Sequence, residues 1–129
     1  MKCIKWKESY ELGIPELDIQ HRMLFNIIKI LVDSVDQSRE GEVIEKVLNE
    51  LERYTYYHAE TEERFFEDTE NHREHIMEHD KFKEDISGFM VAYENTPDRE
   101  FVEMMLLYLQ SWIENHVTGM DRRDFLGED

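Results

Sequence analysis

Cysteine, proline and glycine are scarce in this chain of 129 residues, which contains one cysteine, two prolines and five glycines. A single cysteine excludes an internal disulfide, and Cys3 is assigned no role. Because proline and glycine are the residues that most often interrupt helices, their scarcity leaves room for long helical segments. The positions of the few that are present divide the chain into four such segments.

Basic residues and long apolar runs are also lacking. Against 31 aspartate and glutamate residues there are 15 lysines and arginines, and the formal net charge is −16. A surface this acidic repels phosphate backbones and anionic lipids, so we expect neither nucleic acid nor a membrane as a partner. The longest apolar run, residues 104–109, is too short to span a bilayer, and residues 1–9 lack the apolar stretch of a signal peptide. We therefore expect a cytoplasmic protein.

Hydrophobic residues make up 40% of the chain and aromatic residues 12%, which is enough for a packed core. The length suits a single domain that covers residues 1–129. After an N-terminal arm, apolar periodicity predicts helices over residues 16–37, 42–66, 72–94 and 98–117. Long helices with short connections predict an all-α protein, an up-down-up-down antiparallel four-helix bundle.

The ends of the predicted helices carry their own signals. Pro15 suits the first turn of the first helix, and Thr96 or Asp98 can cap the start of the fourth. Polar residues 68–71 predict a turn before the third helix. Gly119 predicts the end of the fourth helix, because glycine is favoured just beyond a helix C-terminus.

Polar residues occupy core positions at one end of the predicted bundle. Steps of three and four residues keep side chains on one helix face. These steps, with one residue beyond the fourth helix, select His21, His58, Glu62, His75, His79, His116 and Asp121. Burying these groups without a cation would leave several charged or unpaired groups together, so the pattern predicts a metal site. Seven ligands and two carboxylates that can bridge suit two metal ions of five or six coordination, and the many imidazoles favour iron.

The same residues resemble the ligand pattern of the hemerythrin family. The resemblance covers nearly the whole chain and lies in Asp18-Ile19-Gln20-His21, His58 with Glu62, His75 with His79, and Trp112-Ile113-Glu114-Asn115-His116 followed by Asp121. It implies that His75, His79 and His116 bind one iron ion and that His21 and His58 bind the other. Glu62, Asp121 and an oxo or hydroxo group derived from water would bridge the two ions. It also implies that dioxygen binds reversibly as a hydroperoxide at the open position of one iron, while the bridging hydroxide becomes oxide.

The surroundings of the open position are where the chain departs from the family pattern. Ala59 follows His58, where bacterial relatives commonly carry a bulky phenylalanine. The candidates for an apolar oxygen pocket are Leu24, Ala59, Trp112 and Val117, each of which ordinary core packing explains equally well. Space beside Ala59 would admit water and favour irreversible oxidation unless Phe66 fills it. A diiron redox enzyme with peroxidase- or oxidase-like activity is therefore the alternative to an oxygen-binding protein.

Three other interpretations explain less of the pattern. A ferritin-like diiron enzyme would show two Glu-x-x-His motifs, and the chain has none. Residues 75–79 match the H-x-x-E-H pattern of inverted zinc peptidases, but a peptidase leaves the other three predicted histidine ligands unexplained, so Glu78 is interpreted as a solvated helix residue. The third interpretation is a helical interaction module that binds no metal. Analysis of metal content would distinguish it from the other interpretations.

Some questions stay open at this point. His72 has no matching ligand position, and we expect it at an exposed turn. No catalytic residue is predicted, and we expect an oxygen-binding protein rather than an enzyme. Oxygen carriage, storage, scavenging and sensing share this chemistry, and no protein partner is indicated.

Overall fold

The computed structural model describes residues 2–65, 72–95 and 98–121, without the side chains of His72, Met120 and Asp121. The predicted turn at residues 68–71, Phe66 and the alternative cap Thr96 lie outside the described residues.

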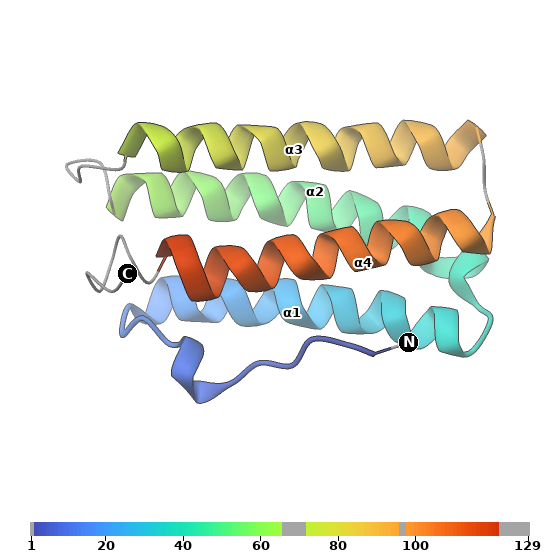
Figure 1. Ribbon diagram of the computed structural model, residues 1–129, viewed down its shortest axis with the longest axis horizontal. Helices are drawn as coiled ribbons and strands as arrows, with labels where there is room; N and C mark the ends of the chain where they lie inside the picture. The colour runs from blue at the N-terminus through green and yellow to red at the C-terminus, as the bar shows by residue number, and fades with distance from the viewer. Residues whose placement is uncertain (1, 66–71, 96–97, 122–129) are drawn as a thin grey trace.

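The described chain is helical and contains no strand. A short 3₁₀ turn precedes four α-helices, and a π-helical turn follows them. The elements are η1 (Glu8–Tyr10), α1 (Pro15–Asp36), α2 (Glu40–Phe65), α3 (His72–Asn95), α4 (Arg99–Asn115) and η2 (His116–Asp121). Successive helices run in opposite directions, and α1 and α3 each pack against both α2 and α4 (Figure 1). The predicted antiparallel four-helix bundle with an N-terminal arm is thereby confirmed.

The first helix starts at a proline, as predicted. Pro15 occupies the first turn of α1, where its missing N–H costs no hydrogen bond. The preceding turn is fixed by Asp18, whose carboxylate accepts hydrogen bonds from the backbone N–H groups of Leu12 at 2.8 Å and Gly13 at 3.2 Å. Gly13 has a φ of +81°, a conformation that glycine adopts without strain. This turn joins the arm to α1.

The start of α4 is also capped as predicted. The Asp98 side chain accepts a hydrogen bond of 2.8 Å from the backbone N–H of Phe101, which satisfies one of the free donors of the first turn. Arg99 then donates to the backbone oxygen of Val35 and to the hydroxyl of Ser38, both at 2.8 Å. These contacts hold the beginning of α4 against the end of α1.

The end of α4 differs from the prediction. The α-helical part ends at Asn115, and the chain continues as the π-helix η2 through Gly119 to Asp121. Gly119 therefore does not stop the helix. In an α-helix residues five apart are about 1.4 turns apart. A π-helix has i→i+5 hydrogen bonds and more residues per turn, so residues five apart in it are separated by little more than one turn. The backbone of Asp121 is thus about one turn beyond that of His116.

The N-terminal arm lies along α1 and α4 (Figure 1). The backbone N–H of Ile4 donates to the side-chain oxygen of Gln110 at 2.8 Å. The Trp6 ring packs edge to face on Tyr10 and Phe25, with centroids 5.5 and 5.4 Å apart. Edge-to-face packing of this kind adds to the burial energy of the rings. The arm thereby covers the side of the bundle next to His21, whose ring centroid lies 6.5 Å from that of Trp6.

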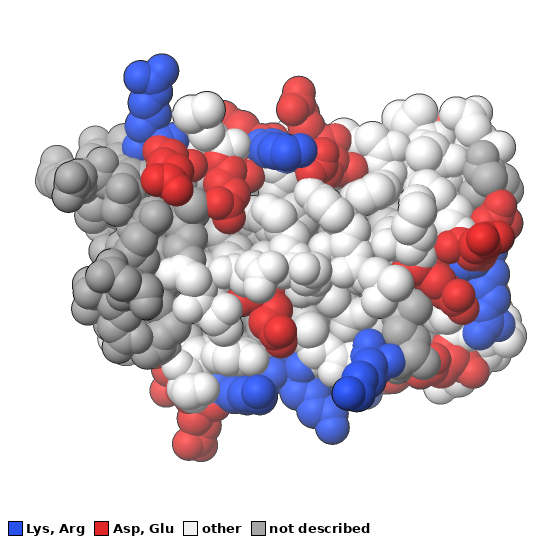
Figure 2. Space-filling model, in the orientation of Figure 1, with Lys and Arg blue, Asp and Glu red and all other residues white. Residues whose placement is uncertain are grey.

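The middle of the bundle is an apolar core to which all four helices contribute. Its fully buried side chains include Ile28, Leu51, Phe82, Ile86 and Leu109. On the face seen in Figure 2, charged side chains lie mainly along the edges, with few across the middle. Among the described helices, none is both long enough and apolar enough to cross a membrane.

Candidate metal centre

Five histidines and one glutamate meet inside one end of the bundle, where α1 and α3 begin and α2 and α4 end (Figure 1). Each helix supplies at least one of them, with His116 coming from the junction of α4 and η2. Every one of the six is at most 3% exposed: His21, His58, Glu62, His75, His79 and His116. The helical spacing thus brings together the six predicted ligands whose side chains are described.

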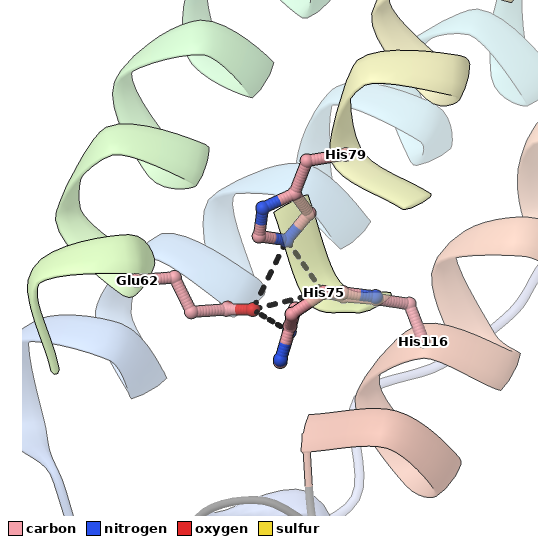
Figure 3. A group of neighbouring side chains, drawn as sticks. All are labelled: Glu62, His75, His79 and His116. Atoms are coloured by element: carbon pink, nitrogen blue, oxygen red, sulfur yellow. Dashed lines mark hydrogen bonds and ion pairs between the residues drawn. The ribbon is translucent and has the colours of Figure 1, made fainter. Parts of the chain in front are cut away.

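The Glu62 carboxylate lies at the centre of this group, and each of its oxygens faces a different set of histidines. Glu62 Oε1 lies 2.6 Å from His75 Nε2, 3.2 Å from His79 Nε2 and 3.0 Å from His116 Nε2 (Figure 3). Glu62 Oε2 lies 2.6 Å from His58 Nε2 and 3.2 Å from His21 Nε2. We call these the three-histidine set and the two-histidine set. One carboxylate therefore joins two separate groups of nitrogen donors.

The spacing of the imidazole nitrogens within each set suits a shared metal ion. The Nε2 atoms of His21 and His58 are 3.0 Å apart, and those of His79 and His116 are 3.3 Å apart. Two nitrogens that each lie about 2.1 Å from one metal, at neighbouring coordination positions, are separated by about 3.0–3.4 Å. Within each set, one ligand atom from every residue lies within 4.8 Å of the others.

A chain of hydrogen bonds fixes which nitrogen of His58 carries the proton. The Thr61 hydroxyl donates to the backbone oxygen of Tyr57 at 3.0 Å and accepts from the Gln20 side-chain nitrogen at 3.1 Å. Gln20 must then present its oxygen to His58 Nδ1, which lies 2.8 Å away and donates to it. With Nδ1 protonated, a neutral His58 ring has its lone pair on Nε2, which faces Glu62.

Two carboxylates play the corresponding part for the three-histidine set. His79 Nδ1 donates to Glu63 at 3.1 Å, and His116 Nδ1 donates to Glu78 at 3.2 Å. Histidines that bind metals commonly donate their other N–H to a carboxylate or carbonyl, which fixes the ring orientation and the tautomer. The interpretation of Glu78 as a solvated helix residue is therefore incomplete, because its partly exposed side chain also contacts a predicted ligand.

Gln20, Thr61 and Glu63 are the residues that the sequence reasoning missed. Periodicity selects side chains that point inward, whereas these three lie beside that face and reach the outer nitrogens of histidines or each other. The available signal was adjacency in the chain. Gln20 precedes His21, and both Thr61 and Glu63 flank Glu62.

The donor set fits metal ions. Burial raises the pKa of Glu62, but the charges of His58 and His116 and hydrogen bonds from His116 and His21 outweigh it, so the pKa lies well below its ordinary value. Without a metal ion, that balance requires protonated imidazoles packed closely together, with the Nε2 atoms of His79 and His116 3.3 Å apart. Neutral rings would avoid this repulsion, but His58, in the tautomer fixed by Gln20, would then point a lone pair at the carboxylate from 2.6 Å. A cation between such groups removes the conflict, and divalent transition metals favour this combination of imidazole and carboxylate.

The other candidate residues differ in what can be said of them. Asp121 ends η2, but its side chain and that of His72 lie outside the described ones, so their predicted roles stay predictions. Leu24, Ala59 and Val117 are buried, and Trp112 is half-buried against the core. A part for these four in holding a ligand also stays a prediction.

Comparison with known proteins agrees with this geometry. Residues 12–125 match the family model described as the hemerythrin HHE cation binding domain. A bacteriohemerythrin of Clostridium acetobutylicum is 27% identical, over 91% of this chain and 95% of its own length. A bacteriohemerythrin of Pseudomonas paraeruginosa is 28% identical, over 94% of this chain and 78% of its own. A hemerythrin-like protein of Naegleria gruberi is 28% identical, over 92% of this chain and 87% of its own length. The matched segment contains both histidine sets and Glu62.

Proposed function

Since the chain belongs to the hemerythrin family, we propose that it is a non-heme diiron protein that binds dioxygen reversibly. The observation that supports this most directly is the position of Glu62, whose two oxygens face separate sets of three and two histidines. A single mononuclear site would not require two such sets. A metal-free polar network would need several protonated imidazoles buried side by side around one carboxylate, which is costly.

The proposed ligands follow the two sets. His75, His79 and His116 hold one iron ion, and His21 and His58 hold the other. Glu62 and Asp121 bridge the ions together with an oxo or hydroxo group. The two-histidine ion has one protein ligand fewer, so it carries the open position. Neutral imidazoles add no charge, while two carboxylates and a hydroxide offset three of the four positive charges of a diferrous pair, which limits the buried charge.

When bound, the iron pair supplies the two electrons with which dioxygen is held in the hydroperoxide form. The chain's own residues orient the ligand nitrogens through Gln20, Glu63 and Glu78 and keep bulk water out by burial. Leu24, Ala59, Trp112 and Val117 are proposed as the apolar surroundings of the open position. Dioxygen is small and neutral, so binding needs no steering charge on the surface.

We also propose the wider setting expected from the sequence. Residues 1–129 form a single domain that acts in the cytoplasm. The acidic surface disfavours nucleic acid and membrane partners. Oxygen carriage, storage, scavenging and sensing all use the proposed chemistry.

The deciding experiment measures iron content and the visible absorption of anaerobically reduced protein before oxygen, after oxygen and after oxygen removal. Two irons per chain and a charge-transfer band that appears and then reverses support the proposal. Two irons with irreversible passage to the diferric state would favour the redox enzyme instead. Failure to bind iron would overturn the proposal. Protein loaded with zinc is the control, because zinc has no redox chemistry and gives no such band.

A further inference from the structure

The two histidine sets differ in the groups behind their rings. His58, in the two-histidine set, donates its outer N–H to the neutral amide of Gln20 at 2.8 Å. His79 and His116, in the three-histidine set, donate theirs to the carboxylates of Glu63 at 3.1 Å and Glu78 at 3.2 Å. The described outer contacts are therefore of two chemical kinds.

These two kinds of partner act differently on a metal ion. A hydrogen bond to a carboxylate is charge-assisted and draws the Nδ1 proton away from the ring, which makes Nε2 the stronger electron donor. The negative charge also stabilises a ferric ion more than a ferrous ion. An amide oxygen offers only a dipole. Hydrogen bonds and charge around ligands are known levers on the reduction potential of iron.

The burial of these contacts sustains the difference. The side chains of His79 and His116 are each 2% exposed, so the donor N–H groups of these hydrogen bonds are buried. The carboxylate side chains are 27% exposed for Glu63 and 32% for Glu78, so water screens part of their charge. Two such contacts on one set nevertheless act in the same direction.

We propose that the metal ion of the three-histidine set is the first of the pair to be oxidised, and that Glu63 and Glu78 set this order as positioning residues. The inference rests on the proposed function, because it needs one redox-active ion in each set. In the simplest step, the diferrous pair loses one electron to an outer-sphere acceptor such as ferricyanide, which becomes ferrocyanide. One ferric and one ferrous ion remain, and no bond in the protein is formed or broken.

The experiment measures the two successive oxidation potentials of iron-loaded protein, together with metal content and far-UV circular dichroism for every variant. Glu63→Gln and Glu78→Gln keep the side-chain shape but remove the charge, so each is expected to raise the first potential. Gln20→Glu adds a charge behind His58 and is expected to lower the second potential, narrowing the gap. Glu60→Gln is the matched control, since Glu60 is an exposed acidic residue of α2 near Glu63.

A second readout does not depend on redox chemistry. Mutation of the partner behind a metal-binding histidine typically weakens metal affinity about 10–100-fold, and glutamine at these two positions can keep the hydrogen bond but removes its charge. Titration of metal-free protein with Co²⁺ should therefore show a weaker three-histidine site in Glu63→Gln and Glu78→Gln than in Glu60→Gln.

The outcomes separate this inference from the proposed function. Wild-type protein that binds fewer than two irons would overturn both. Two bound irons, with potentials in Glu63→Gln and Glu78→Gln that shift no more than in Glu60→Gln, would overturn the inference and leave the proposed function standing. If these two variants fold poorly, Gln20→Glu still decides, because an unchanged or raised second potential contradicts the proposed electrostatic origin.

Discussion

The indole ring of Trp112 lies nearly parallel to the imidazole ring of His116, with centroids 4.6 Å and planes 11° apart. The same indole stacks on Phe82, with centroids 3.6 Å and planes 4° apart. Phe82 is fully buried in the core. The orientation of one proposed iron ligand is therefore tied through Trp112 to the apolar interior of the bundle.

Replacing this ring should loosen the three-histidine set. Trp112→Leu removes the flat surface beside His116, so we expect about tenfold weaker binding of the metal ion held by that set. We also expect a loss of stability of about 1–3 kcal/mol from lost stacking and packing. Metal titration and urea unfolding measure the two effects. Trp112→Phe is the control, because it keeps a flat ring, and equal weakening in both variants would show that stacking does not matter.

The ligand positions make a sharper prediction for two histidines. His116→Ala removes one of three nitrogens that face Glu62 Oε1, so bound iron should fall from two ions per chain to about one. His72→Ala should leave both ions bound, since His72 has no place in the ligand pattern. Iron analysis of the purified variants checks this. Retention of two irons by His116→Ala would contradict the ligand assignment.

The convergence of the six described site residues could be predicted because it depends on two simple regularities. Residues three or four apart share a helix face, which places His58 over Glu62 and His75 over His79. Antiparallel packing of four helices then brings those faces to one end. Neither step needs the exact rotation of any helix.

The contacts behind the histidines could not be predicted in this way. Glu63 reaches His79 on another helix, and Glu78 reaches His116, so both contacts depend on how neighbouring helices are rotated and spaced. The end of α4 was mispredicted for a related reason. Glycine is favoured just beyond the end of a helix, but it can also adopt helical backbone angles. At Gly119 the backbone remains helical.

Tyr108 provides a prediction about pH. The pKa of Tyr108 is raised to about 12. The largest cause is burial, followed by the hydrogen bond that the hydroxyl donates to Asp85 and by the negative charges of Asp85 and Glu78. The ordinary value for tyrosine is about 10. The folded state therefore holds this proton more tightly than the unfolded state, and the stability that results is present below about pH 10 and is lost as pH rises toward 12.

Two measurements test the Tyr108 prediction. An ultraviolet titration of the folded protein follows the ionisation of its tyrosines. The ionisation step at the highest pH should be absent in Tyr108→Phe. Urea unfolding between pH 9 and pH 11 should show a smaller loss of stability for Tyr108→Phe than for wild-type protein. An identical pH dependence of the two proteins would mean that Tyr108 has no raised pKa.

The hydroxyl of Thr61 should control metal binding in the two-histidine set without touching a metal. Thr61→Val preserves the side-chain shape but removes the acceptor that fixes the Gln20 amide, so Gln20 is free to turn its NH₂ group toward His58 Nδ1. His58 would then carry its proton on Nε2, where it opposes a cation. We expect about tenfold weaker metal binding at the two-histidine set and unchanged binding at the three-histidine set. Stepwise titration of metal-free protein with Co²⁺ measures both affinities.

Thr118→Val is the matched control, since the Thr118 hydroxyl also donates to a backbone oxygen four residues earlier but is exposed. Equal affinities in the two variants would exclude tautomer control by Thr61.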